Sequence, residues 1–376
     1  MSVIGDTTLT FSEEQGMLLD VAREFCRTRS PVDAVRRQLE TPGGFDPALW
    51  DEMVALGWAG ISLPESVGGS GLGAAALVPV VECMGRALLT TPLMSSALAG
   101  QLLLRAGSES QTGQWLADIA SGAAATVAWL ENGDWGDSGL QAQLDDQYVL
   151  RARKLFVPDA QAARYLVVPA MHRGEVALAV VAAGQLEAQA FTANTLVDLT
   201  KRAANVEFSE IQLTAQSVVT GPAVAAALHD VRLLGALLVA AEAAGSAAAC
   251  LDTVVGYLNT RKQFGRLIGS YQALKHPCVD ILTGIDSARS FIYHASSLVA
   301  GEGFDRNVEI ACRMAKAQAC ETLLYAGDRA VQFHGGMGFS WECDAQLYLR
   351  RAQWSQQQFG DSQHHRKRLA ALLLDT

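Results

Sequence analysis

Two stretches near the C-terminus, Thr260-Arg-Lys-Gln-Phe-Gly265 and Gln332-Phe-His-Gly-Gly-Met-Gly338, decide the fold of this chain. Each follows a long segment with helical periodicity and ends in glycine. A glycine-rich turn at a helix end allows backbone N–H groups to approach an anion, and the Arg261 guanidinium can bind a phosphate through two parallel hydrogen bonds. Alone, either stretch could be an ordinary helix C-cap with a surface arginine. Together they favour a phosphate-containing ligand.

The sequence around these stretches predicts a helical bundle. Apolar residues recur at helical spacing over residues 222–259, 271–300, 306–334 and 343–355, and a last helix is expected from Asp361 to Leu374. Short links rich in glycine separate the segments. Four long helices joined in this way form a bundle, and we assign residues 217–376 to this domain.

The N-terminal part of the chain is predicted to be helical and the middle part to be β structure. In residues 1–122 the clearest helix start is Asp46-Pro47, because aspartate can cap a helix and proline suits its first position. Residues 123–216 contain short runs rich in Val, Tyr and Phe, separated by Gly, Asp, Asn and Pro. No segment of helical length lies between neighbouring runs, so we expect an antiparallel sheet. The predicted fold class is α+β, with a helical, a β and a helical-bundle domain in that order.

The composition excludes several classes of protein. Of the 376 residues, 50% are hydrophobic and 18% are charged, which is typical of a folded chain with wide buried surfaces. The net charge of −10 argues against nucleic-acid binding, because phosphate contacts need clustered cations. The apolar stretch from Leu233 to Cys250 is interrupted by Glu242 and fits a buried helix better than a membrane span. The seven cysteines are scattered and no secretory signal is visible, so we expect a reduced, cytoplasmic protein.

Two further patterns do not predict a site. Gly69-Ser-Gly-Leu-Gly-Ala74 matches the glycine fingerprint of dinucleotide-binding folds, but no predicted strand precedes it and no acidic residue follows at the required distance. We therefore expect a surface turn there. The histidines His276, His334, His364 and His365 lack the spacing of zinc ligands, so we expect no metal site.

The chain resembles an acyl-CoA dehydrogenase over nearly its whole length. The family's R-K-x-F-G and Q-x-x-G-G-x-G signatures stand at Arg261–Gly265 and Gln332–Gly338, and its P-E-x-x-G-G-x-G turn is similar to Pro64–Gly71. The order of the three domains is also the same. The resemblance implies the family's fold and its reaction, the FAD-dependent α,β-dehydrogenation of an acyl-CoA thioester.

The resemblance also implies which residues bind FAD. In such enzymes the cofactor lies between the β domain and the bundle, and the neighbouring subunit completes its site. Arg261 would pair with the pyrophosphate, Phe264 would pack near the dinucleotide and Gln272 would lie near the adenosine. The other expected contacts are Gln332, Gly335 and Gly336 from across the dimer, and Ser362 and Gln363 at the start of the last helix. The family implies an electron-transfer flavoprotein as the electron acceptor.

The chain departs from the family where the chemistry takes place. The family's catalytic glutamate stands at one of two positions, which are occupied here by Phe359 and Val231. Its T-E-P-x-x-G-S-D loop compares with Leu130–Asp137. In its K-x-W-I-T-N segment, which contacts the flavin, the tryptophan is replaced by Phe156 and the threonine by Pro158. Proline has neither a hydroxyl nor a backbone N–H to offer the flavin.

These departures lead to three hypotheses. The first is a base-lacking subunit of a heteromeric acyl-CoA dehydrogenase, similar to subunits of the heterotetrameric enzymes of bacterial steroid and bulky-substrate degradation. A second acyl-CoA dehydrogenase-like chain would then supply the base and the flavin wall. The second hypothesis is a self-sufficient homotetramer that uses Asp361 or Asp230 as its base, although Asp361 equally suits the N-cap of the last helix. The third is a non-enzymatic paralogue that binds a CoA ligand.

Overall fold

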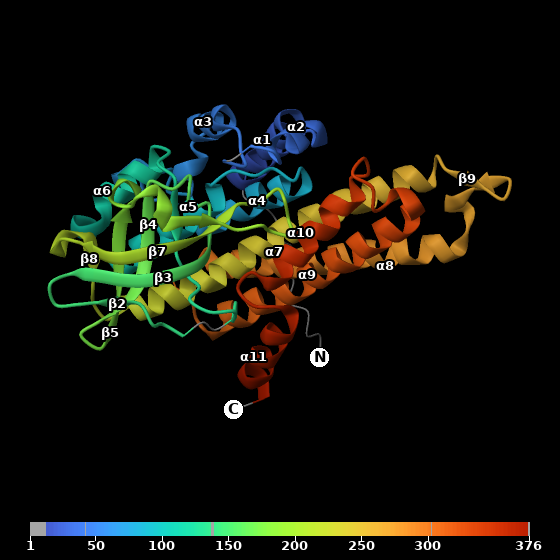
Figure 1. Cartoon of the computed structure of the whole chain (residues 1–376). Helices are drawn as coiled ribbons and strands as arrows, with labels where there is room; N and C mark the ends of the chain where they lie inside the picture. The colour runs from blue at the N-terminus through green and yellow to red at the C-terminus, as the bar shows by residue number, and fades with distance from the viewer. Residues whose placement is uncertain (1–12, 42, 137–138, 302, 375–376) are drawn as a thin grey trace.

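The N-terminal part of the chain is helical, as predicted. The structure is a computed structural model that describes residues 13–41, 43–136, 139–301 and 303–374 (Figure 1). Asp46 caps its helix as expected, because its Oδ1 accepts a hydrogen bond from the Ala48 N–H at 2.9 Å. A short 3-10 turn, not a strand, precedes Gly69–Ala74, which confirms the predicted turn. The helices are α1 (Glu13–Arg29), α2 (Val32–Gln38), α3 (Pro47–Ala55), α4 (Leu77–Arg86), α5 (Leu93–Ala106) and α6 (Glu109–Ala120).

The middle part forms one mixed sheet. Its strands are β1 (Ala125–Val127), β2 (Gln143–Leu144), β3 (Val149–Pro158), β4 (Tyr165–His172), β5 (Glu175–Ala182), β6 (Phe191–Ala193), β7 (Ala203–Gln212) and β8 (Val218–Val219). They lie in the order β6-β7-β3-β2-β4-β5-β8, and β1 also pairs with β4. The prediction of a purely antiparallel sheet was wrong, because β1 and β2 each run parallel to β4. A parallel pair needs a long crossover connection, and here β3, rather than a helix, is part of that connection.

The C-terminal part is the predicted bundle. Its helices are α7 (Ala223–Leu258), α8 (Gln272–Val299), α9 (Arg306–His334), α10 (Ala345–Gln357) and α11 (Ser362–Leu374). Helix α9 packs against each of the other four. A small hairpin of β9 (Lys262–Gln263) and β10 (Arg266–Leu267) joins α7 to α8. Helix α7 is long and apolar enough to cross a membrane, but its apolar stretch is fully buried in the protein, so it is a core helix. The domain boundaries at residues 122 and 216 stay a prediction.

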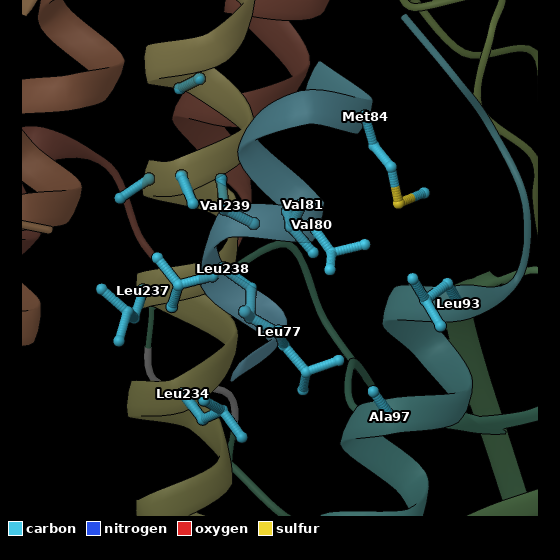
Figure 2. Close-up of a cluster of buried hydrophobic side chains, with 14 of the residues drawn as sticks. Leu77, Val80, Val81, Met84, Leu93, Ala97, Leu234, Leu237, Leu238 and Val239 are labelled. Atoms are coloured by element: carbon cyan, nitrogen blue, oxygen red, sulfur yellow. The ribbon is translucent and has the colours of Figure 1, made fainter. Parts of the chain in front are cut away.

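Helices α4 and α7 approach each other closely. Figure 2 shows apolar side chains of α4, among them Leu77 and Val80, packed between α7 and α5. Glycines permit this approach: a Cβ added at Gly85 would lie 2.1 Å from the Glu242 carbonyl oxygen, and one at Gly245 would lie 1.9 Å from the Glu82 carbonyl oxygen. Any larger residue at either position would force the helices apart.

A buried ion pair connects the loop before β2 to strand β3 of the sheet. Lys154 on β3 pairs with Glu131, and both side chains are almost fully buried. The ammonium also donates a hydrogen bond to the Pro169 carbonyl oxygen at 2.9 Å. Burial lowers the pKa of Lys154, and the interactions with Glu131 oppose that shift. Each of the two buried charges is therefore stabilised by the other.

We expect Lys154→Met to destabilise the chain strongly, because it leaves the Glu131 carboxylate buried without its partner. Breaking one side of a buried ion pair typically costs about 3–5 kcal/mol of the free energy of unfolding. Urea unfolding measures this loss. Arg151→Met is the matched control on the same strand: Arg151 pairs with Asp145 and Glu210 in a half-exposed position, where an ion pair contributes about 0–1 kcal/mol. Equal losses in the two variants would contradict a stabilising role for the buried pair.

Candidate functional site

The two sequence signatures meet at one end of the bundle. The Tyr257 ring at the end of α7 stacks on the His334 ring at the end of α9, with 4.3 Å between the ring centroids. Arg261 lies four residues after Tyr257, and its backbone N–H donates to the Tyr257 carbonyl oxygen at 2.9 Å. Gly335 is the residue after His334. Two segments about 70 residues apart in sequence are thus neighbours in space.

The hairpin at this end exposes groups that suit a nucleotide. Phe264 and Gly265 form its two-residue turn with φ of +53° and +79°, the combination that fits the twist of a two-stranded hairpin. The Phe264 ring is 91% exposed, and a non-glycine residue in this conformation is strained, as functional residues often are. The Arg261 side chain is exposed and forms no hydrogen bond or ion pair with the residues that the structure describes. Gln272, Gln332, Gly335 and Gly336 are also exposed.

A second group of predicted site residues surrounds a cavity of about 100 Å³. Parts of α4, α5, β1, β3, α7 and the link between α10 and α11 enclose it. Most of its wall is apolar, with polar groups at a few points. The aromatic residues that line it are Trp129, Trp135, Phe156, Trp354 and Phe359, and the charged ones are Asp159, Lys201, Arg202, Arg232 and Glu242.

The wall that the family uses for the flavin ring is covered by the chain's own side chains. Phe156 has a φ of +47° and lies at an irregularity in the β3–β7 pairing. The Trp135 ring packs between Phe156 and Trp354, with centroid distances of 5.2 and 5.6 Å. Pro158 lines the same cavity and has no N–H to donate. These residues do not fit an isoalloxazine ring, whereas the exposed groups around Arg261 fit the phosphates of a dinucleotide.

The two positions at which the family carries its catalytic base lie close together in the structure. The Phe359 ring lies on α7 so closely that a Cβ added at Gly235 would come within 2.4 Å of it. Val231 lies one turn before Gly235 and is fully buried. Trp129 packs edge-on against Phe359, with 6.0 Å between the centroids. Both base positions therefore hold apolar groups that cannot accept a proton.

The two groups of site residues lie far apart within one chain. Helix α7 runs without a break from the Val231 position to the hairpin, and at about 1.5 Å per residue this spans roughly 40 Å. Figure 1 shows the hairpin at the end of the bundle that is farthest from the β sheet. One FAD molecule cannot reach both groups of the same chain.

The comparisons with known proteins agree on the family. The sequence profile of the acyl-CoA dehydrogenase C-terminal domain matches residues 227–374, and that of the N-terminal domain matches residues 12–123. The acyl-CoA dehydrogenase IpdE2 of Mycolicibacterium smegmatis is 30% identical over 370 residues, which cover 96% of this chain and 99% of that protein. This chain belongs to the acyl-CoA dehydrogenase family. Members of the family are FAD-dependent oxidoreductases that act on CH–CH bonds.

Solved structures of this acyl-CoA dehydrogenase fold match the whole chain. The ChsE4–ChsE5 complex from Mycobacterium tuberculosis has a chain with a TM-score of 0.88 and 25% identity, covering 98% of this chain and 100% of that one. A variant of the Tcur3481–Tcur3483 steroid ACAD has a TM-score of 0.85 and 26% identity, covering 96% and 98%. The three-part fold that the sequence predicts is therefore that of the family.

The two carboxylates weighed as substitute bases have other partners in this acyl-CoA dehydrogenase. The Asp361 Oδ1 accepts a hydrogen bond from the His364 N–H at 2.7 Å, which is the expected N-cap of α11. Asp230 pairs with Arg105 of α5 at 3.7 Å. Burial raises the pKa of Asp230, and Arg105 opposes that shift. Neither carboxylate lines the cavity.

Asp159 and Glu242 line the cavity instead, and the sequence did not point to them. Ser95 Oγ donates a hydrogen bond to Asp159 at 2.5 Å, and burial raises the pKa of Asp159 despite that bond and the nearby Lys201. Glu242 accepts from Lys201 at 2.5 Å and pairs with the fully buried Arg351 at 3.0 Å. Burial alone would raise the pKa of Glu242, but Arg351 and Lys201 lower it. Glu242 is thus an ionised part of a structural network.

The last two predicted FAD contacts lie away from the hairpin. Ser362 is buried, and its Oγ donates to the Ala317 carbonyl oxygen at 3.3 Å and to Gln356 at 3.2 Å. Gln363 beside it is exposed. Arg261 and Phe264 thus lie on the hairpin, Gln272 at the start of α8, and Gln332, Gly335 and Gly336 at the end of α9, which contacts the end of α7. Ser362 and Gln363 lie elsewhere, near the middle of α9.

Proposed function

We propose that this chain is the base-lacking subunit of a heteromeric FAD-dependent acyl-CoA dehydrogenase. Its exposed hairpin and α9 end bind the nucleotide part of a FAD whose isoalloxazine ring lies in a partner chain. That partner supplies the flavin wall and the catalytic glutamate. One observation carries the proposal: Phe359 and Val231 fill both base positions and Trp135 covers the flavin wall, while the Arg261 end of the same chain stays exposed.

Exposed apolar side chains on the hairpin and in the link between α9 and α10 support contact with another chain. Phe264, Phe339 and Trp341 are 91%, 78% and 54% exposed. Large apolar groups gathered on a surface mark a protein interface more often than a solvated face. The similar ChsE4–ChsE5 structure is itself a complex. A second acyl-CoA dehydrogenase-like chain is the partner that fits.

We propose a bulky acyl-CoA, such as a steroid derivative, as the substrate class. The support is the likeness to a steroid ACAD and the flavin wall of this chain, which its own side chains cover. A chain that holds no acyl group of its own would leave space for a larger one in its partner. An electron-transfer flavoprotein as acceptor and a cytoplasmic location are further parts of the proposal. Ser362 and Gln363 lie on the side of the covered flavin wall, and their contact with FAD stays a prediction.

Expression of the chain alone and together with an adjacent dehydrogenase-like gene product tests the proposal. Alone, the chain should show no flavin absorbance and no acyl-CoA dehydrogenation, because it lacks a base and a flavin wall. The two chains together should form a heteromer, seen by native mass spectrometry, that contains flavin and is active. Flavin and activity in the single chain would show a homotetramer, and CoA-ligand binding without flavin in either sample would show a non-enzymatic paralogue.

A further inference from the structure

Four exposed side chains form a narrow stripe along helix α8. They are Lys275, Val279, Leu282 and Asp286, of which Val279 and Leu282 are 55% and 49% exposed. Their spacing of four, three and four residues keeps them within about 60° of the helix circumference, because an α-helix has about 3.6 residues per turn. Figure 1 shows α8 at the edge of the bundle, where it packs against α7 and α9. The stripe lies on the side of α8 that these helices leave uncovered.

The charged residues at the two ends of the stripe have no partner within the chain. Neither Lys275 nor Asp286 forms a hydrogen bond or an ion pair with the residues that the structure describes. Lys275 also lies in the first turn of α8, where the helix dipole disfavours a cation. Two large apolar groups between two unpaired opposite charges are more typical of a contact surface than of a solvated helix face.

The order of the groups along the stripe is self-complementary. It is cation, apolar, apolar, anion, with equal spacing on both sides of a midpoint between residues 280 and 281. When two copies of such a helix lie antiparallel about this midpoint, Val279 of one copy meets Leu282 of the other. In the same arrangement Lys275 meets Asp286. A two-fold axis forms each of these contacts twice.

Helix α9 carries further exposed apolar side chains beside the stripe. A Cβ added at Gly284 of α8 would lie 3.0 Å from the Thr322 side chain of α9. The turn of α9 that follows Thr322 therefore lies at the level of the stripe. Leu324 and Tyr325 of that turn are 36% and 39% exposed. The apolar area at this level of the bundle is thus larger than that of Val279 and Leu282 alone.

We propose that the stripe joins two copies of this chain through an antiparallel contact between their α8 helices. The pairing itself needs only this chain, whereas its place in the assembly rests on the proposed function. The hairpin binds the partner chain, and the α8 contact joins two such pairs into a heterotetramer in which the two copies of this chain are neighbours. In an assembly with two copies of each chain, the exact two-fold axis relates identical chains. A self-complementary surface is satisfied at that axis.

Sedimentation velocity of the two-chain complex, over a range of concentrations, tests the pairing with charge-reversal variants. Lys275→Glu and Asp286→Lys each place like charges opposite each other at both ends of the contact. Each should weaken the association of two heterodimers about tenfold or more. The double variant Lys275→Glu/Asp286→Lys restores opposite charges and should restore the heterotetramer. Asp280→Lys is the matched control, because Asp280 is exposed on the same helix but lies about 100° around it from Val279.

Heterodimers in the two single variants, with heterotetramers in the unmodified complex, the double variant and Asp280→Lys, support the pairing. Single variants that stay tetrameric, or an unmodified complex that stays a heterodimer, would overturn it. A double variant that does not recover the heterotetramer would also overturn it, because the stripe would then bind the other chain.

The failure of the proposed function is seen separately, as two chains that do not bind each other. The same variants of the full chain alone then decide about the stripe. A dimer that dissociates in the two single variants and re-forms in the double variant supports the pairing. An unmodified chain that is monomeric at all concentrations overturns it.

Discussion

Replacing Asp361 by asparagine should leave the heteromeric dehydrogenase active, whereas removing the partner's catalytic glutamate should lower its rate about 100–10,000-fold, the usual contribution of a general base. Asparagine keeps the oxygen that accepts the His364 N–H and loses the ability to take a proton. Asp159→Asn should also leave the enzyme active, although Asp159 lines the cavity. Steady-state rates with an acyl-CoA substrate measure all three variants.

The FAD content of each variant complex is the control for these rates. Equal flavin content shows that a lost rate comes from chemistry and not from cofactor loss. Collapse of the rate in Asp361→Asn or in Asp159→Asn, with FAD still bound, would show that this chain carries the base.

Arg261→Ala should weaken FAD binding to the complex by about 10–150-fold, which corresponds to about 1.5–3 kcal/mol for a charge-assisted contact. The guanidinium is exposed on the hairpin with no internal partner among the described residues, so its removal costs the fold little. Titration of the flavin-free complex with FAD measures the affinity.

Arg266→Ala is the matched control for Arg261→Ala. Arg266 lies on the other strand of the same hairpin, and its guanidinium stacks over the Tyr271 ring at 4.0 Å. Its loss should change FAD affinity much less. An unchanged affinity in Arg261→Ala would refute the assignment of the hairpin to the cofactor.

The helices of this protein could be predicted closely from the sequence, and the directions of its strands could not. Periodic apolar residues define α8 and α9 to within a few residues of their observed ends, because each of these helices buries one continuous face. The ends of α7 could be predicted as closely from its long apolar stretch, which is buried on all sides. The sequence of a strand shows that it is a strand, but it does not show which other strand pairs with it. The parallel pairing of β1 with β4 joins segments that are far apart in sequence, and no local signal records that pairing.

The candidate site could be predicted in part for the same reason. Arg261 and Gln332 lie in short, continuous sequence motifs, so the resemblance to the family was enough to identify them. Trp135 could not be found, because the loop that carries it departs from the family's loop in sequence and its contact with Phe156 exists only in the folded chain. The network of Lys201, Glu242 and Arg351 likewise joins the loop before β7 to α7 and α10.

The number of FAD molecules per chain in the purified two-chain complex tests the central claim most directly. Quantitative absorbance of the released flavin gives this number, and native mass gives the number of chains. If this chain closes its own flavin site and completes that of its partner, the complex holds half as many FAD molecules as chains. One FAD for every chain would contradict the account.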